Sequence, residues 1–122
     1  MAGKTNLIIL IEPDEAVRTA LCSMLKQHEW TVDVIESATG LATTLGASTP
    51  RVVVSESSLR DTPAAEVLAA CKAASVPIVF LGHRHEIQEA VDLMRKGAHD
   101  YLEKPFPQAR LLSILEELRT EE

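Results

Sequence analysis

The sequence predicts an α/β protein, a doubly wound sheet of five parallel strands covered by helices on both faces as a three-layer sandwich. Short apolar runs alternate five times with amphipathic stretches of helical spacing, which is the pattern of a parallel sheet with crossover helices. The first run, residues 7–11, is an unbroken aliphatic block of the kind found in strands buried on both faces. The length of 122 residues suits one domain with a core of its own.

The first half of the chain alternates strand, helix, strand and helix. Asp14 follows the strand at 7–11 and suits the N-cap of a helix, whose apolar positions recur from 17 to 25. A weaker second strand is predicted at 32–35. A short helix at 41–45 follows and is closed by Gly46.

The second half repeats the alternation three times. Residues 52–54 are β-branched and predict the third strand. Thr62-Pro63 then predicts a helix with a cap followed by proline, and its buried stripe is made of Ala65, Leu68 and Cys71. The remaining elements are a strand at 78–81, a helix from 87 that ends at Gly97, a strand at 101–102 and a helix at 111–118.

Composition excludes several classes of protein. The 18 acidic and 12 basic residues give a formal charge of −6, which disfavours direct binding to a nucleic-acid backbone. The longest apolar run is too short to cross a bilayer, and the start has no signal-peptide pattern, so we expect a cytoplasmic protein. Cys22 and Cys71 have no Cys-x-x-Cys spacing and are interpreted as small core residues.

In such a sheet, ligands bind beyond the carboxyl ends of the strands, so the residues that follow the strands are the candidate site. They are Glu12-Pro13, Ser55-Glu56, Gly82-His83 and Glu103-Lys104. A lysine at this edge can direct its ammonium at an anion in the crevice, and Pro105 is a candidate for a cis peptide bond that holds a tight turn.

The stretch 96–106, Lys-Gly-Ala-His-Asp-Tyr-Leu-Glu-Lys-Pro-Phe, resembles the end of a bacterial response-regulator receiver domain. The resemblance extends to residues 11–18 and 50–66, and in total it covers about residues 6–119 as a single receiver-like domain. It implies a flavodoxin-like (βα)5 fold and a role in two-component or phosphorelay signal transduction. In that family a histidine kinase supplies a phosphoryl group to an aspartate that ends strand three.

The resemblance also implies the roles of the neighbouring positions. An acidic pair after strand one and the phosphoacceptor aspartate hold Mg²⁺, and a Ser or Thr after strand four bonds the phosphoryl group. Here the phosphoacceptor position is Glu56, the acidic pair is Glu12-Pro13, and the Ser/Thr position is Gly82. Most of the positions that carry out phosphoryl transfer in the family are therefore altered here. We expect Mg²⁺ binding to be weak or lost.

Two positions match the family, namely the lysine that pairs with the phosphoryl group, Lys104, and the switch aromatic of strand five, Tyr101. The extra methylene of Glu56 moves its carboxylate about 1.5 Å outward, and a misplacement of about 1 Å can slow a reaction by two orders of magnitude. The same reach predicts an ion pair between Glu56 and Lys104, within about 4 Å.

Other polar residues at this edge have simpler interpretations. His83 and His85, with Glu56, form only a weak metal-site pattern, because two histidines two positions apart on a loop carry little information. We interpret them as solvent-facing loop residues. Asp61 is interpreted as part of the cap of the helix that starts at Thr62-Pro63.

The sequence thus predicts a degenerate receiver, or pseudo-receiver, that is not an enzyme and works without phosphorylation. Glu56 either mimics the phosphorylated state or is only a carboxylate satisfied by Lys104, and both interpretations stay open.

The expected partners are proteins bound by the fourth helix, fifth strand and fifth helix, including a second copy, with no nucleic acid or membrane contact. A C-terminal output domain, of a transcription regulator, is expected in the parent protein. The alternatives are a receiver still phosphorylated on Glu56 with Mg²⁺, in which Asp14 replaces the lost ligand, and a small-molecule sensor.

Overall fold

The computed structural model describes residues 5–83 and 86–120, and its centre is one parallel sheet of five strands in the order β2-β1-β3-β4-β5. The strands are β1 (Leu7–Ile11), β2 (Thr31–Ile35), β3 (Val52–Glu56), β4 (Ile78–His83) and β5 (Asp100–Lys104). All four strand pairs are parallel. The predicted sheet is confirmed.

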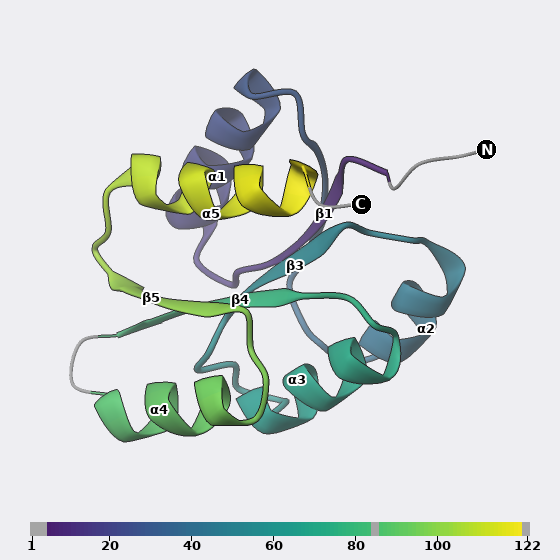
Figure 1. Ribbon diagram of the computed structural model, residues 1–122, viewed down its shortest axis with the longest axis vertical. Helices are drawn as coiled ribbons and strands as arrows, with labels where there is room; N and C mark the ends of the chain where they lie inside the picture. Colours follow the sequence, from purple (N-terminus) through teal and green to yellow (C-terminus); the bar gives the residue numbers. More distant parts are fainter. Residues whose placement is uncertain (1–4, 84–85, 121–122) are drawn as a thin grey trace.

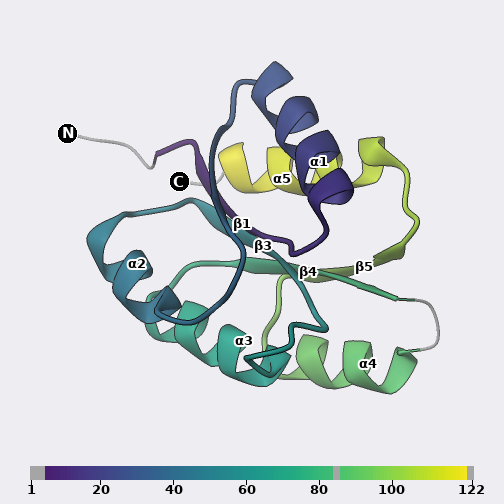
Figure 2. The ribbon, with the colours of Figure 1, turned by 180° about the vertical axis from the view of Figure 1, so that it is seen from behind.

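The helices cover both faces of the sheet. They are α1 (Glu15–Gln27), α2 (Leu41–Ala47), α3 (Ala64–Ala73), α4 (Ile87–Arg95) and α5 (Gln108–Thr120). Figures 1 and 2 show α1 and α5 on one face and α2, α3 and α4 on the other. The architecture is a doubly wound three-layer sandwich, because each helix joins two successive parallel strands and the strand order reverses at β1, which places the helices on opposite faces.

The two faces of the central strands bury separate apolar clusters. Ile8 and Leu10 of β1 pack in the cluster under α1 and α5, whereas Ile9 and Ile11 pack under α2 and α3. Alternate residues of a strand point to opposite faces, so a strand covered on both sides must be apolar throughout. This is why residues 7–11 form an uninterrupted aliphatic run.

Two predicted helix boundaries agree with the structure. The Asp14 carboxylate accepts a hydrogen bond from the Val17 amide at 3.1 Å and caps α1. Gly97 follows the end of α4 with a φ of 112°, a left-handed conformation that favours glycine.

Three local predictions were wrong. α3 begins at Ala64, because Pro63 is extended and its carbonyl accepts the first helical bonds, so Pro63 rather than Thr62 is the N-cap. Ala64, not Ala65, is buried as a consequence of this shift. Gly46 lies inside α2, which ends at Ala47 with Ser48 as its C-cap.

The strand order reverses at β1, which pairs with β2 on one side and β3 on the other. Ile11 is in register with Ser55, so the next residues, Glu12 and Glu56, stand side by side at the carboxyl edge. Crevices at such a reversal are where ligands bind in open α/β sheets. The strands run further than predicted, and Glu56, His83 and Lys104 are their last residues.

Both cysteines are free, and Cys71 is fully buried in the cluster under α3, where burial raises the pKa of its thiol to about 12. Cys22 is half-buried and packs on the cluster under α1. In the described part of the chain, the structure contains no helix with the length and apolar character needed to span a membrane.

Candidate functional site

The centre of the site is the ammonium group of Lys104, which lies between two carboxylates. Its Nζ atom donates a hydrogen bond to Glu12 Oε1 at 2.8 Å and a second one to Glu56 Oε1. Glu12 and Glu56 are only 2% and 4% exposed, and the Lys104 side chain is 18% exposed. The ion pair between Glu56 and Lys104 predicted from the sequence is confirmed, and Glu12 shares it.

Burial and charge act in opposite directions on Lys104. Burial disfavours its charged form, but the hydrogen bonds and negative charges of Glu12 and Glu56 outweigh burial and raise the pKa of the ammonium. Buried carboxylates are tolerated when they are paired and hydrogen-bonded. The lysine therefore makes the burial of both acids possible.

The second oxygen of each carboxylate is also bonded. Glu12 Oε2 accepts a hydrogen bond from the Asp14 amide at 3.2 Å, and Glu56 Oε2 accepts one from the Ser58 amide at 3.0 Å. His83 Nε2 lies 3.6 Å from Glu56 Oε2. Both acids are thus held at each oxygen, and their orientation is fixed by the chain itself.

The family to which the sequence is similar uses Mg²⁺, and these residues do not fit that ion. Mg²⁺ needs near-octahedral oxygen ligands at about 2.0–2.1 Å. Pro13 offers no side-chain oxygen, and one oxygen of each remaining acid already pairs with Lys104. The Asp14 carboxylate is engaged in capping α1. These side chains form an ion-pair cluster whose oxygens are already bonded, and they do not supply the ligands that Mg²⁺ needs.

Tyr101 lies directly over Gly82 on the neighbouring strand. A Cβ atom built on Gly82 would lie 1.7 Å from the Tyr101 hydroxyl oxygen and 2.8 Å from Ser57 Oγ. Ser57 Oγ and the Tyr101 hydroxyl are 3.3 Å apart and share a hydrogen bond. The tyrosine thus occupies space that any side chain at position 82 would claim.

Burial is the main cause that raises the pKa of Tyr101, and the nearby carboxylates of Glu86, Glu89 and Glu56 add to it. The hydrogen bond with Ser57 acts in the opposite direction. The phenol is consequently held neutral, as a hydrogen-bonding hydroxyl at the edge of the acidic site.

Two acids at the start of α4 complete the site, and the sequence analysis missed both. Glu86 accepts hydrogen bonds from the Ser58 hydroxyl at 3.2 Å and from the His83 amide at 3.2 Å. Glu89 has a buried oxygen without a hydrogen-bond partner in the described structure. Burial, followed by the charge of Glu86, raises the pKa of Glu89.

The remaining predicted positions have structural roles or lie outside the described residues. The Lys104–Pro105 peptide bond is cis. Asp61 does not cap α3, because its carboxylate accepts hydrogen bonds from Ser37 and Thr39, which tie the loop after β2 to the loop after β3. His85 lies outside the described residues, and the described ones hold no cluster of His, Cys, Asp and Glu suited to a metal ion.

Comparisons with known proteins show the family and the fold of the chain. The family model of the response regulator receiver domain matches residues 8–116. The chain belongs to the response regulator receiver domain family. The DNA-binding transcriptional regulator NtrC of Rhizobium meliloti is 29% identical over 117 residues, which are 94% of this chain and 24% of that protein.

A second relative is the C4-dicarboxylate transport transcriptional regulatory protein DctD of Pseudomonas aeruginosa, 33% identical over 86% of this chain and 23% of its own length. This receiver domain thus spans about a quarter of the length of these two relatives. Full-length FixJ of B. japonicum has a similar structure, with a TM-score of 0.85, 28% identity, and coverage of 96% of this chain and 59% of that one. The beryllofluoride-activated NtrC4 receiver domain dimer shares the fold at 19% identity, with a TM-score of 0.84 and coverage of 93% and 96%.

Proposed function

We propose that this receiver domain is a regulatory module that works without phosphoryl transfer, as a pseudo-receiver. The observation that carries the proposal is the ion pair of Lys104 with Glu56 and Glu12. In a phosphorylatable receiver the lysine would pair with an incoming phosphoryl group. Here a permanent carboxylate of the chain takes that place, so the lysine needs no added group to be satisfied.

Three changes support the loss of phosphoryl transfer. Glu56 is held by Lys104 and by the Ser58 amide, so attack on a phosphoryl donor would first break these bonds. Pro13 removes an oxygen from the acidic pair, and Gly82 removes the hydroxyl that would bond a phosphoryl oxygen. Phosphoryl transfer depends almost entirely on positioning and electrostatic stabilisation, and each change removes one of these contributions.

The inward position of Tyr101 supports a fixed regulatory state. In the family the aromatic of strand five rotates when the receiver is activated. Gly82 leaves room for Tyr101, and the bond with Ser57 holds its hydroxyl there. We infer that Glu56 and Gly82 together keep the domain in one signalling conformation, with Glu56 as a built-in surrogate of the phosphorylated state.

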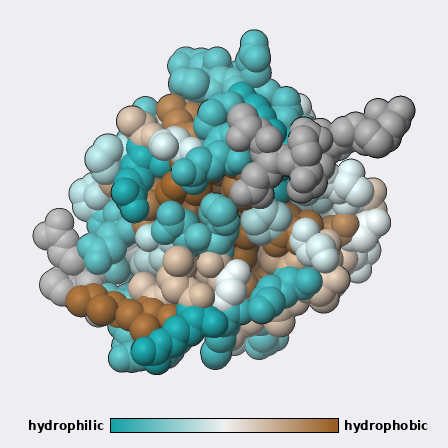
Figure 3. Space-filling view, viewed as in Figure 1, coloured by the Kyte–Doolittle hydropathy of each residue, from teal (hydrophilic) through white to brown (hydrophobic). Residues whose placement is uncertain are grey.

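The partner surface in this proposal is the face formed by α4, β5 and α5. Ile87, at the start of α4, is 68% exposed, and Val91 and Met94 follow on the same side of the helix. Figure 3 shows a hydrophobic patch over the start of α4. An apolar stripe at helical spacing that is left uncovered is typical of a protein contact.

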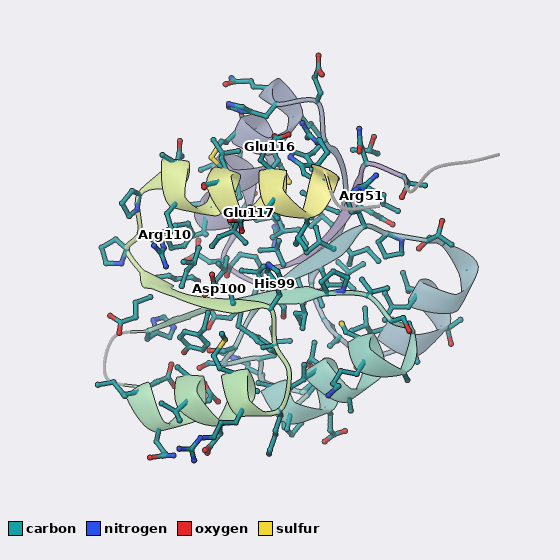
Figure 4. All side chains as sticks on the ribbon, in the orientation of Figure 1. Arg51, His99, Asp100, Arg110, Glu116 and Glu117 are labelled. Atoms are coloured by element: carbon teal, nitrogen blue, oxygen red, sulfur yellow. The ribbon has the colours of Figure 1, made fainter. Side chains whose placement is uncertain are left out.

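The other part of the face is polar. Figure 4 shows Asp100 of β5 beside Arg110 and Glu117 of α5, and these residues line a hollow of about 300 Å³. Charges of both signs on one surface suit a self-complementary contact, as in a twofold dimer. We therefore propose a second copy of the chain, or an output domain of a transcription regulator, as the partner of this face.

The proposal is tested with beryllofluoride, which imitates a phosphoryl group on a receiver. The ¹⁵N-labelled chain is mixed with Mg²⁺ and beryllofluoride, and the amide signals of Ser58 and Tyr101 are followed. The Pro13→Asp/Glu56→Asp variant restores the two lost aspartates and serves as the matched control. Unchanged spectra for the natural chain, with shifts in the variant, support the proposal, and Mg²⁺-dependent shifts at Ser58 in the natural chain overturn it.

A further inference from the structure

A hollow of about 620 Å³ lies between the first half of α1 and the loop from β5 to α5. Figure 2 shows these two segments on the same face of the sheet. The volume is within the range of about 300–1,000 Å³ found for small-molecule sites. The proposed function makes no use of this hollow.

Most of the hollow is lined by apolar side chains. Ala16 and Ala20 line it from α1, where both are exposed, and Pro105 and Phe106 line it from the loop after β5. Residues four apart on a helix lie on one face, so the two alanines leave a gap that larger side chains would fill. These walls suit a ligand with an apolar or aromatic body.

The charged groups in the lining offset one another. The Asp14 carboxylate and the Lys104 ammonium have opposite charges, and the imidazole of His83 lies 3.6 Å from Glu56 Oε2. The acids that pair with Lys104, Glu12 and Glu56, are buried and are not part of the described lining. A ligand ammonium would meet Lys104, and a ligand carboxylate would compete with two acids for the same cation. Because an unpaired charge on apolar walls is costly, this lining favours a neutral ligand.

The polar end of the hollow presents a hydrogen-bond donor beside an acceptor. An ammonium has three protons, and Lys104 donates to Glu12 and Glu56, which leaves one N–H. One oxygen of Asp14 accepts from the Val17 amide, and the other has no partner among the described residues. Glu12 holds the two groups near each other, because its Oε1 accepts from Lys104 at 2.8 Å and its Oε2 from the Asp14 amide at 3.2 Å. The end therefore suits a group that both accepts and donates.

We propose that this hollow binds a small molecule that ends in a neutral primary carboxamide. Its apolar body lies between Ala20 and Phe106, its carbonyl oxygen accepts from Lys104, and its NH₂ group donates to Asp14. A primary carboxamide has an acceptor and a donor side by side and no charge, so it matches both the paired groups and the offsetting charges. The inference goes beyond the proposed function, because the bound molecule leaves both ion pairs of Lys104 in place.

The test compares four probes with the same apolar body: phenylpropanamide, its N,N-dimethyl derivative, phenylpropylamine and phenylpropanoate. Each is titrated into the ¹⁵N-labelled chain, and amide shifts are recorded. Phenylpropanamide is expected to shift the signals of Ala16, Ala20 and Phe106 at a concentration about ten-fold lower than each of the others, which is the ratio for one hydrogen bond. An equal or stronger response to any other probe, shifts that map elsewhere, or no shifts overturn the proposal.

Two variants locate the binding. Asp14→Ser keeps a good helix cap while removing the second oxygen, so it is expected to weaken binding of phenylpropanamide about five-fold and to leave binding of the dimethyl derivative unchanged. Ala20→Leu fills the hollow and is expected to abolish the shifts, whereas Ala69→Leu, at an exposed position within α3, is the matched control and leaves them unchanged. An equal loss for both amides in Asp14→Ser, or binding that survives in Ala20→Leu, contradicts the proposal.

Discussion

The hydroxyl oxygen of Tyr101 lies 1.7 Å from the place that a Cβ atom would take on Gly82. Two residues on neighbouring strands therefore exclude each other, since any side chain at 82 requires the tyrosine to move. This steric contact is present without a phosphoryl group. Because Gly82 stands where the family has a Ser or Thr, the absence of a side chain there allows the position that Tyr101 takes.

The first prediction concerns Gly82→Ser. The added Cβ forces the Tyr101 side chain away from Ser57, so the pKa of the phenol falls back towards its ordinary value of 10.0. Overpacking of this kind costs about 1–3 kcal/mol of the free energy of unfolding. Ultraviolet titration of the single tyrosine measures the pKa, and urea unfolding measures the stability.

Gly46→Ser is the matched control for this variant, because a Cβ atom there meets nothing within 4 Å. It should leave the tyrosine titration unchanged. A Gly82→Ser protein with the natural titration curve would show that Tyr101 is not held by the space above residue 82.

The second prediction concerns Lys104→Met, which removes the cation between two buried acids. Because a buried charge without its partner is strongly unfavourable, the free energy of unfolding should fall by about 3 kcal/mol at neutral pH. Adding Glu56→Gln to this variant should recover part of the loss. Lys26→Met, in the last turn of α1, is the control and should change stability by less than about 0.5 kcal/mol.

The third prediction is a pH dependence that comes from Glu89. The folded state raises the pKa of this carboxyl above its ordinary value of 4.5, so the folded state holds the proton more tightly than the unfolded state. The stability it contributes is complete below pH 4.5 and is lost as the pH rises through the raised pKa. Since Glu89 is partly open to solvent, the loss amounts to a few tenths of a kcal/mol.

Glu89→Gln removes this titration, so the variant should gain stability relative to the natural chain as the pH rises from 4 to 7. Urea unfolding across that range measures the difference. Glu103→Gln, at an exposed position on β5, provides the comparison. A difference of the opposite sign would contradict the unfavourable burial of ionised Glu89.

The fourth prediction concerns the exposed stripe of α4. Ile87→Lys places a charge on the patch, and because the side chain is 68% exposed, the free energy of unfolding should change by less than about 0.5 kcal/mol. Self-association of the chain should weaken at least ten-fold, as measured by sedimentation equilibrium. Gln88→Lys, the next residue on α4, tests whether charge alone has this effect.

The strands and the position of the site could be predicted from the sequence because both depend on local patterns. The aliphatic run of β1 and the residues that end the parallel strands bring Glu12, Glu56 and Lys104 to one edge. The reach of a glutamate then predicts the ion pair. These inferences need only the spacing of apolar residues along the chain and the direction of the strands.

The contact of Tyr101 with Gly82 and Ser57 could not be predicted in the same way. It depends on the direction in which the Tyr101 ring points, and on how β3, β4 and β5 are aligned with one another. The start of α3 was misjudged because a Thr-Pro pair fits either of two helix starts, and Thr62 instead donates to Asp61. Glu89 was missed because an acid near a helix start has an ordinary explanation in the helix dipole.

Intact-mass spectrometry decides whether the domain works without phosphoryl transfer. The chain is incubated with Mg²⁺ and acetyl phosphate beside the Pro13→Asp/Glu56→Asp variant. The natural chain is expected to keep its mass, while the variant gains one phosphoryl group. A Mg²⁺-dependent gain of one phosphoryl group on Glu56 of the natural chain would contradict this expectation.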